Sequence, residues 1–153
     1  MLNLEGKIVF ITGASSGIGE ACAKEFAKQK ANLILAARRK DRLLKLADEL
    51  EKQYEIKVKC LEVDVRNFDD VQNKFNSLES KWKQVDILLN NAGLARGLNK
   101  VYEGNLSDWD EMIDTNLKGL LNVTRVVSPQ MVERQSGQII NIGSTAGHEV
   151  YTH

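Results

Sequence analysis

The sequence predicts an α/β fold, a doubly wound, Rossmann-like parallel sheet, and three observations support this prediction. Apolar runs of strand length alternate with longer segments of helical periodicity, and five strands can be counted along the chain. The first two runs are almost continuously apolar, as is typical of strands covered on both faces. Polar or glycine-bearing loops follow the strands. Right-handed β–α–β connections then predict the strand order 3-2-1-4-5, with ligands bound at the carboxyl ends of the strands.

The first strands are expected at residues 7–12 and 32–37. Between them, Ile18, Cys22 and Phe26 recur at helical spacing, which predicts a helix that turns these three side chains toward the sheet.

A second helix is expected over residues 40–54, because apolar residues form one stripe along it. The stripe consists of Leu43, Leu46, Ala47 and Leu50. A third strand over 57–64 ends at Asp64, and Asn67 is suited to cap the helix that follows. The fourth strand and its exit loop are expected within 85–93.

A long helix and a fifth strand complete the pattern. Ser107 is expected to cap the helix, which runs to about Glu133 unless Pro129 kinks or ends it earlier. The fifth strand, within 137–144, is expected to be buried and to lead into a polar loop at Ser144.

The composition narrows the class of protein. A chain of 153 residues is expected to form one domain over residues 1–153. Lysine plus arginine and aspartate plus glutamate both number 21, so the net charge of zero argues against nucleic-acid or membrane partners. No secretory leader and no apolar run long enough for a membrane helix is present, which favours a cytoplasmic location. Cys22 and Cys60 fit no metal or redox spacing, so no metal site is expected.

The glycine loop predicts a dinucleotide site. Gly13, Gly17 and Gly19 lie between the first strand and the first helix. There, glycines let a diphosphate approach backbone N–H groups and a helix N-terminus closely. The spacing differs from the common G-x-G-x-x-G pattern, but the strand–loop–helix context supports this interpretation over a simple connecting turn.

The end of the second strand favours NADP over NAD. An NAD site usually carries an acidic residue there for the ribose 2′-hydroxyl. Here Ala37 occupies that place, and Arg38 and Arg39 follow it. Arg38, with help from Arg39 and the Ser15 hydroxyl, is expected to hold a 2′-phosphate. The alternative is that both arginines are ordinary solvated charges at the start of a helix.

Five motifs in order resemble the short-chain dehydrogenase/reductase family. They are TGASSGIG at 12–19, DV at 64–65, NNAG at 90–93, Asn116 in DTNLKG, and IINIGS at 139–144. Three longer stretches resemble the branch of NADP-dependent serine and 3-hydroxy acid dehydrogenases, namely LAARR at 35–39, NNAGLARG at 90–97 and INIGSTAG at 140–147.

This resemblance implies a role for each motif. Gly13, Ser16, Gly17 and Ile18 would cradle the diphosphate and a ribose, in a loop that also holds Gly19. Asp64 would accept a hydrogen bond from the adenine amino group, and Val65 would lie against the ring. Asn91 would stand beside the ribose, with Ala92 and Gly93 in the same motif. Ser144 would be the catalytic serine, and Asn116 would belong to a proton relay.

Structural roles for the same residues stay open. Asp64 could simply end a strand, and Asn90 and Asn91 could serve the turn that they occupy. Asn116 could be a surface residue of a helix, and the Ser144 hydroxyl could satisfy the backbone of its own loop.

Two departures from the family pattern stand out. Lys30 occupies a turn where members often carry glycine, so a left-handed lysine with about 1 kcal/mol of strain is expected. More seriously, the family's Y-x-x-x-K segment is absent from the 153 residues, because Tyr151 lies too close to Ser144 to be its tyrosine. The chain is therefore expected to be the N-terminal part of a longer enzyme, with a sheet incomplete at its C-terminal edge. Metal binding by His148, Tyr151 and His153 is a poor alternative to an ordinary loop.

The resemblance implies an NADP-dependent oxidoreductase that acts on a small hydroxy or carbonyl compound, such as serine, another 3-hydroxy acid, a sugar or a steroid-like alcohol. The long helix implies a homodimer or homotetramer of the complete protein. By itself, this chain is expected to be inactive. A non-catalytic NADP(H)-binding module stays an alternative, and an interaction protein that lost its site is disfavoured by the retained polar residues.

Overall fold

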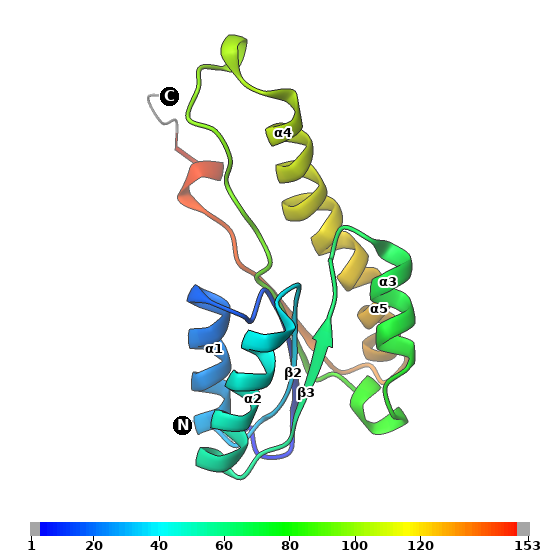
Figure 1. Ribbon diagram of the computed structural model, residues 1–153. Helices are drawn as coiled ribbons and strands as arrows, with labels where there is room; N and C mark the ends of the chain where they lie inside the picture. Colours follow the sequence, from blue (N-terminus) through cyan, green and yellow to red (C-terminus); the bar gives the residue numbers. More distant parts are fainter. Residues whose placement is uncertain (1–3, 150–153) are drawn as a thin grey trace.

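The computed structural model describes residues 4–149 and contains a five-stranded sheet in the order β3-β2-β1-β4-β5 (Figure 1). All four strand pairs are parallel. The predicted fold class and strand order are therefore confirmed. The strands are β1 Ile8–Thr12, β2 Asn32–Ala37, β3 Val58–Glu62, β4 Ile87–Asn90 and β5 Gln138–Asn141.

Helices cover both faces of the sheet (Figure 1). On one face lie α1 (Gly17–Lys28) and α2 (Lys40–Tyr54), and on the other lie α3 (Phe68–Asn76) and α5 (Leu120–Glu133). Three short 3-10 turns connect these elements: η1 Ser80–Lys83, η2 Val101–Glu103 and η4 Thr145–Gly147. Buried side chains between each helix pair and the sheet make two core layers, which fix the strand ends in space.

Several local predictions are confirmed. Helix α2 has the predicted bounds and buries the predicted stripe of Leu43, Leu46, Ala47 and Leu50. Asn67 caps α3 by accepting a hydrogen bond from the backbone N–H of Asp70 at 3.0 Å. Lys30 has a φ of 63°, as expected for a left-handed turn residue.

The predicted inward face of α1 is wrong at Ile18. The buried residues of α1 are Gly19, Ala23 and Ala27, while Cys22 and Phe26 pack beside them and Ile18 is 59% exposed. Ile18 lies in the first turn of the helix, where the glycine loop ends. The small residues Ala23 and Ala27 occupy the interface with the sheet.

The expectation of a buried fifth strand is also wrong. Strand β5 is largely exposed, in contrast to β1, β2 and β4, whose residues are nearly all buried. It pairs with β4, and residues 4–149 place no strand along its outer edge. An unpaired edge leaves backbone groups open to further pairing.

The predicted long helix is interrupted. It consists of α4 (Leu106–Met112), a π-helical segment η3 (Ile113–Gly119) and α5. Asn105, not Ser107, caps its start, because the Asn105 side chain accepts both the backbone N–H and the hydroxyl of Ser107. Pro129 does not end the helix, which continues to Glu133.

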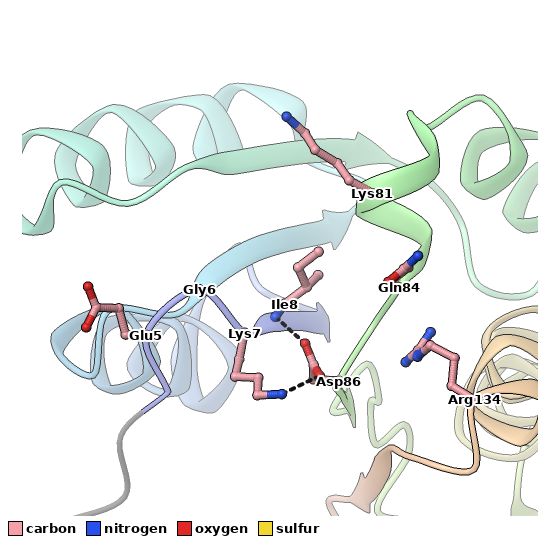
Figure 2. A pocket seen from close by; sticks show the side chains of 8 residues that line it. All are labelled: Glu5, Gly6, Lys7, Ile8, Lys81, Gln84, Asp86 and Arg134. Atoms are coloured by element: carbon pink, nitrogen blue, oxygen red, sulfur yellow. Dashed lines mark hydrogen bonds and ion pairs between the residues drawn. The ribbon is translucent and has the colours of Figure 1, made fainter.

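The Asp86 carboxylate links the amino ends of β1 and β4. Figure 2 shows Asp86, just before β4, with its oxygens facing Lys7 and Ile8. It accepts the backbone N–H of Ile8 at 2.9 Å and pairs with the Lys7 ammonium at 3.0 Å. Arg134 donates to the Val85 carbonyl at 2.8 Å in the same region. These contacts satisfy polar backbone groups at the amino ends of β1 and β4.

Candidate functional site

A cavity of about 860 Å³ lies at the carboxyl ends of the strands. Its volume is within the usual range for small-molecule sites. Almost all of the residues singled out from the sequence line it, and Gly17 and Gly19 are the two that do not. Those that do are Gly13, Ser15, Ser16, Ile18, Arg38, Arg39, Asp64, Val65, Asn91, Ala92, Gly93, Asn116 and Ser144.

The glycine loop packs against the loop after β4 too closely for side chains. A Cβ on Gly13 would lie 2.8 Å from Asn91 Nδ2 and 2.9 Å from Ala92 Cα, and the φ of Gly13 is +67°. A Cβ on Gly19 would lie 2.5 Å from both Asn91 Nδ2 and the Gly13 carbonyl oxygen. Gly17, with a φ of +59° and open space around it, needs glycine for backbone conformation alone. The resulting loop exposes the N-terminus of α1 to the cavity.

Thr12, which the sequence analysis did not single out, holds these two loops together. Its buried hydroxyl accepts the backbone N–H groups of Asn91 and Ala92, each at 3.0 Å. The Asn91 side chain donates in return to the Thr12 carbonyl at 3.0 Å and to the Gly13 carbonyl at 3.3 Å. The Asn91 amide is therefore partly engaged in structure, as the turn alternative expects.

Arg39 is held over the glycine loop by two hydroxyls. Its Nη2 donates to Ser15 Oγ at 3.0 Å and to Ser16 Oγ at 2.7 Å, and its Nε donates to Ser15 Oγ at 3.2 Å. Neutral hydroxyls leave the guanidinium charge uncompensated. Arg38 also lines the cavity. Position 37, at the end of β2, is an alanine and carries no carboxylate. This arrangement provides an anion site at the end of β2.

Asp64 lies across the cavity from the glycine loop, after β3, and is paired with Arg66. The Arg66 Nη2 donates to Asp64 Oδ2 at 2.6 Å, and its Nε lies 3.0 Å from both oxygens. The hydrogen bond from Arg66 lowers the pKa of the Asp64 carboxyl, and the charge of Arg38 adds to this effect. Asp64 is therefore an ionised acceptor. The DV motif at 64–65 did not predict that Arg66 would pair with Asp64.

Asn116 lies in the π-helical segment and clamps the backbone of Leu94. Its Oδ1 accepts the Leu94 N–H at 2.9 Å, and its Nδ2 donates to the Leu94 carbonyl at 2.8 Å. The neighbouring Thr115 is buried and lines the cavity, and its hydroxyl has no hydrogen-bond partner among the described residues. Such π-helical insertions are frequent at functional sites, and no periodicity in the sequence predicted this one.

Ser144 follows β5 and is exposed at the cavity wall. Its hydroxyl oxygen accepts the backbone N–H of Ala146 at 3.2 Å and so caps the short η4 turn. The hydroxyl hydrogen stays available to a ligand. Tyr151 and His153 lie outside the described residues. Within residues 4–149, no cluster of histidine, cysteine or carboxylate side chains is suited to hold a metal ion.

The sheet order and the cavity above the glycine loop define a Rossmann-like α/β protein. The family model described as short chain dehydrogenase matches residues 7–153, and the chain belongs to that family.

Relatives and a solved structure agree with this assignment. The chain is 46% identical over 144 residues to the NADP-dependent 3-hydroxy acid dehydrogenase YdfG of Salmonella typhi, covering 94% of this chain and 56% of that protein. It is 45% identical to the NADP-dependent 3-hydroxy acid dehydrogenase of Schizosaccharomyces pombe, covering 99% and 59%. The closed form of serine dehydrogenase complexed with NADP+ superposes with a TM-score of 0.86 at 46% identity, covering 94% and 56%.

The chain thus spans somewhat more than half the length of the curated relatives that it matches. Across the part of the chain that the structure describes, no helix is both long and apolar enough to cross a membrane.

Proposed function

We propose that the complete protein is an NADP(H)-dependent oxidoreductase that transfers hydride between the nicotinamide and a small hydroxy or carbonyl compound. The observation that carries the proposal is the anion site at the end of β2, where Arg39 is held by Ser15 and Ser16 and no carboxylate opposes it. An NAD site would need an acceptor there for the ribose hydroxyl. The similarity to NADP-dependent 3-hydroxy acid dehydrogenases supports the same choice.

The residues present fit the adenosine half of NADP. The N-terminus of α1 has no side-chain cap and would receive the diphosphate, with Ser16, Gly17 and Ile18 beside it and the close packing at Gly13 and Gly19 setting the loop. Arg39, with Arg38 and Ser15, would hold the 2′-phosphate. Asp64 would accept the adenine amino group, Val65 would contact the ring, and Asn91, Ala92 and Gly93 would border the ribose.

At the other end of the cavity, Ser144 is the proposed catalytic residue. Its exposed hydroxyl can donate to a substrate oxygen while its own oxygen stays fixed by Ala146. Asn116 would act by holding the Leu94 backbone at the edge of the cavity, in addition to the relay role that the family resemblance implies. The cofactor, when bound, supplies the hydride chemistry.

A hydroxy acid is the proposed substrate class, because the relatives' names include 3-hydroxy acid dehydrogenase and serine dehydrogenase. Residues 1–153 would form the greater part of one dinucleotide-binding domain. A homodimer or homotetramer and a cytoplasmic location stay proposals from the sequence. The oligomer proposal is supported by apolar side chains that are exposed along the interrupted helix, namely Ile113, Leu117 and Leu121.

Assays of the complete protein test the proposed function. NADP+ reduction should be measured with 3-hydroxybutyrate and with serine, and NAD+ should be compared at the same concentrations. We expect turnover with NADP+ and a preference of about tenfold or more over NAD+, the size of one charge-assisted contact. A preference for NAD+ would overturn the cofactor assignment. Tight NADP+ binding without turnover of any hydroxy acid would favour the non-catalytic module.

A further inference from the structure

Arg66 links the carboxylate at the adenine end of the cavity to a second carboxylate on α4. Its guanidinium bonds to Asp64, as described above, and its Nη1 lies 3.7 Å from Glu111 Oε1. Glu111 in turn pairs with Arg96, whose Nε lies 2.7 Å from Glu111 Oε2. The four side chains form a row of alternating charge, and only Asp64 among them lines the cavity.

The backbone of Arg66 is fixed as firmly as its side chain. The Asn122 amide on α5 donates to the Val65 carbonyl at 2.9 Å and to the Arg66 carbonyl at 3.3 Å. The helix also approaches closely at Gly119, where a Cβ would lie 2.6 Å from Val65 Cγ2. The loop after β3 is therefore held from the helix side, and Arg66 has a defined position from which to orient Asp64.

The hydrogen bonds from Arg66 leave the Asp64 carboxylate with one open acceptor position. An ionised carboxylate offers about four acceptor positions. The Arg66 backbone N–H and Nε–H point to Oδ1, and Nη2–H points to Oδ2 while Nε–H is shared. Each oxygen has two contacts, but Nε–H supplies a single hydrogen to both, so three N–H groups leave the carboxylate able to accept one further donor. The lowered pKa of Asp64 keeps that position an acceptor at neutral pH.

We propose that Arg66, anchored by Glu111, is a positioning residue that makes Asp64 select a 6-amino purine over a 6-oxo purine. The inference rests on the proposed function, in which Asp64 faces the adenine amino group. A 6-amino group donates to the remaining acceptor position of the carboxylate. A 6-oxo group puts an acceptor oxygen against a fixed, ionised acceptor. Without Arg66, the carboxylate can rotate away from the oxo group, and the selection weakens.

The probe is nicotinamide hypoxanthine dinucleotide phosphate, which differs from NADP+ at the purine and carries the same phosphates. Dissociation constants for both nucleotides should be measured by calorimetry on the complete protein. The ratio of the two constants cancels any general loss of affinity in a poorly folded variant. It also cancels the change in net charge near the phosphates, which would alter both affinities alike.

We expect the unmutated protein to prefer NADP+ by about tenfold or more, the size expected for one charge-assisted contact. Arg66→Met should reduce this preference to about threefold or less, and Glu111→Gln should give an intermediate value. Asp110→Asn is the matched control, because it removes the neighbouring carboxylate on α4, which contacts neither arginine of the row. The control should leave the preference unchanged.

An unchanged preference in Arg66→Met would overturn the inference, as would equal binding of the two nucleotides by the unmutated protein. In both cases NADP+ still binds, and the proposed function stands. If the unmutated protein binds neither nucleotide, the proposed function fails, and the inference fails with it.

Discussion

The two ends of the cavity are built differently. At the end proposed for the adenosine, the loops after β1, β2 and β4 extend from buried strands, and the buried Thr12 hydroxyl joins the loops after β1 and β4. At the end proposed for the substrate, Ser144 follows the exposed strand β5, and within residues 4–149 its hydroxyl bonds only inside its own turn. Burial of β1, β2 and β4 and the shared hydrogen bonds hold the first end in place, while the second follows β5 alone.

This difference predicts that the proposed nucleotide binding and the proposed catalysis are separable in the complete protein. The groups proposed for the adenosine half all lie before residue 94, in the loops that follow strands β1 to β4. The groups proposed for hydride transfer come later and include a tyrosine and a lysine that the family resemblance implies but that are not among these 153 residues. Each of the following predictions acts on one end and leaves the other as its reference.

The largest effect is expected at the substrate end. In the complete protein, Ser144→Ala removes the hydroxyl that would donate to the substrate oxygen. We expect kcat to fall by about 10²–10⁴, the range for a lost proton-handling group, while the dissociation constant for NADP+ stays within twofold. Steady-state kinetics and calorimetry measure the two quantities. Parallel loss of nucleotide binding would show that the two ends are not separable.

The glycine loop should give the largest effect at the adenosine end. Gly19→Ala places a Cβ 2.5 Å from Asn91 Nδ2 and from the Gly13 carbonyl oxygen, so the loop must shift. We expect the free energy of unfolding to fall by about 1–3 kcal/mol, as for other overpacked sites. The affinity for 2′,5′-ADP should fall by about tenfold or more. Urea unfolding and calorimetry check the two effects, and unchanged affinity would remove the glycine loop from the proposed site.

A smaller effect is expected at the anion site. Arg39→Ala removes the guanidinium that Ser15 and Ser16 hold, and we expect the preference for NADP+ over NAD+ to fall by about tenfold. Arg42→Ala, an exposed arginine on α2, is the control for net charge and should leave the preference intact. An equal loss in both variants would mean that the positive charge acts only at long range.

The smallest effect concerns the pH dependence of Asp64. Its pKa is lowered in the folded protein, so its contribution to stability is present above the unfolded-state pKa and is lost as pH falls through the folded-state pKa. Arg66→Met should raise the pKa of Asp64 toward its ordinary value of 3.8. Carbon-13 NMR of the Asp64 carboxyl, titrated between about pH 5 and pH 1, measures the shift directly. An unchanged pKa of Asp64 in Arg66→Met would show that Arg66 does not stabilise the ionised carboxylate.

Residues with strong local signals were predictable from the sequence. Helix α2 was predicted with its bounds because its apolar stripe is regular, and the Asn67 cap because an asparagine precedes an acidic first turn. The cavity-lining residues followed from the rule that parallel strands share a carboxyl edge, together with the family motifs.

The features that the sequence analysis missed depend on side-chain geometry and backbone conformation that no residue pattern specifies. Thr12 matters because β1 and β4 are neighbours in the sheet, and Arg66 because it turns back onto Asp64. The π-helical segment leaves the helical period that pattern analysis assumes. At the start of α4, Ser107 was the predicted cap, but Asn105, two residues earlier, accepts the N–H and the hydroxyl of Ser107.

Calorimetric titration of the 153-residue chain with 2′,5′-ADP and with 5′-AMP tests the separation of the two ends most directly. Circular dichroism first confirms that the chain is folded. We predict saturable binding of 2′,5′-ADP, tighter than 5′-AMP by about tenfold because the 2′-phosphate reaches the anion site at Arg39. The same chain should turn over neither 3-hydroxybutyrate nor serine. A folded chain that binds neither ligand, or binds both with equal affinity, would contradict an adenosine site completed before residue 94.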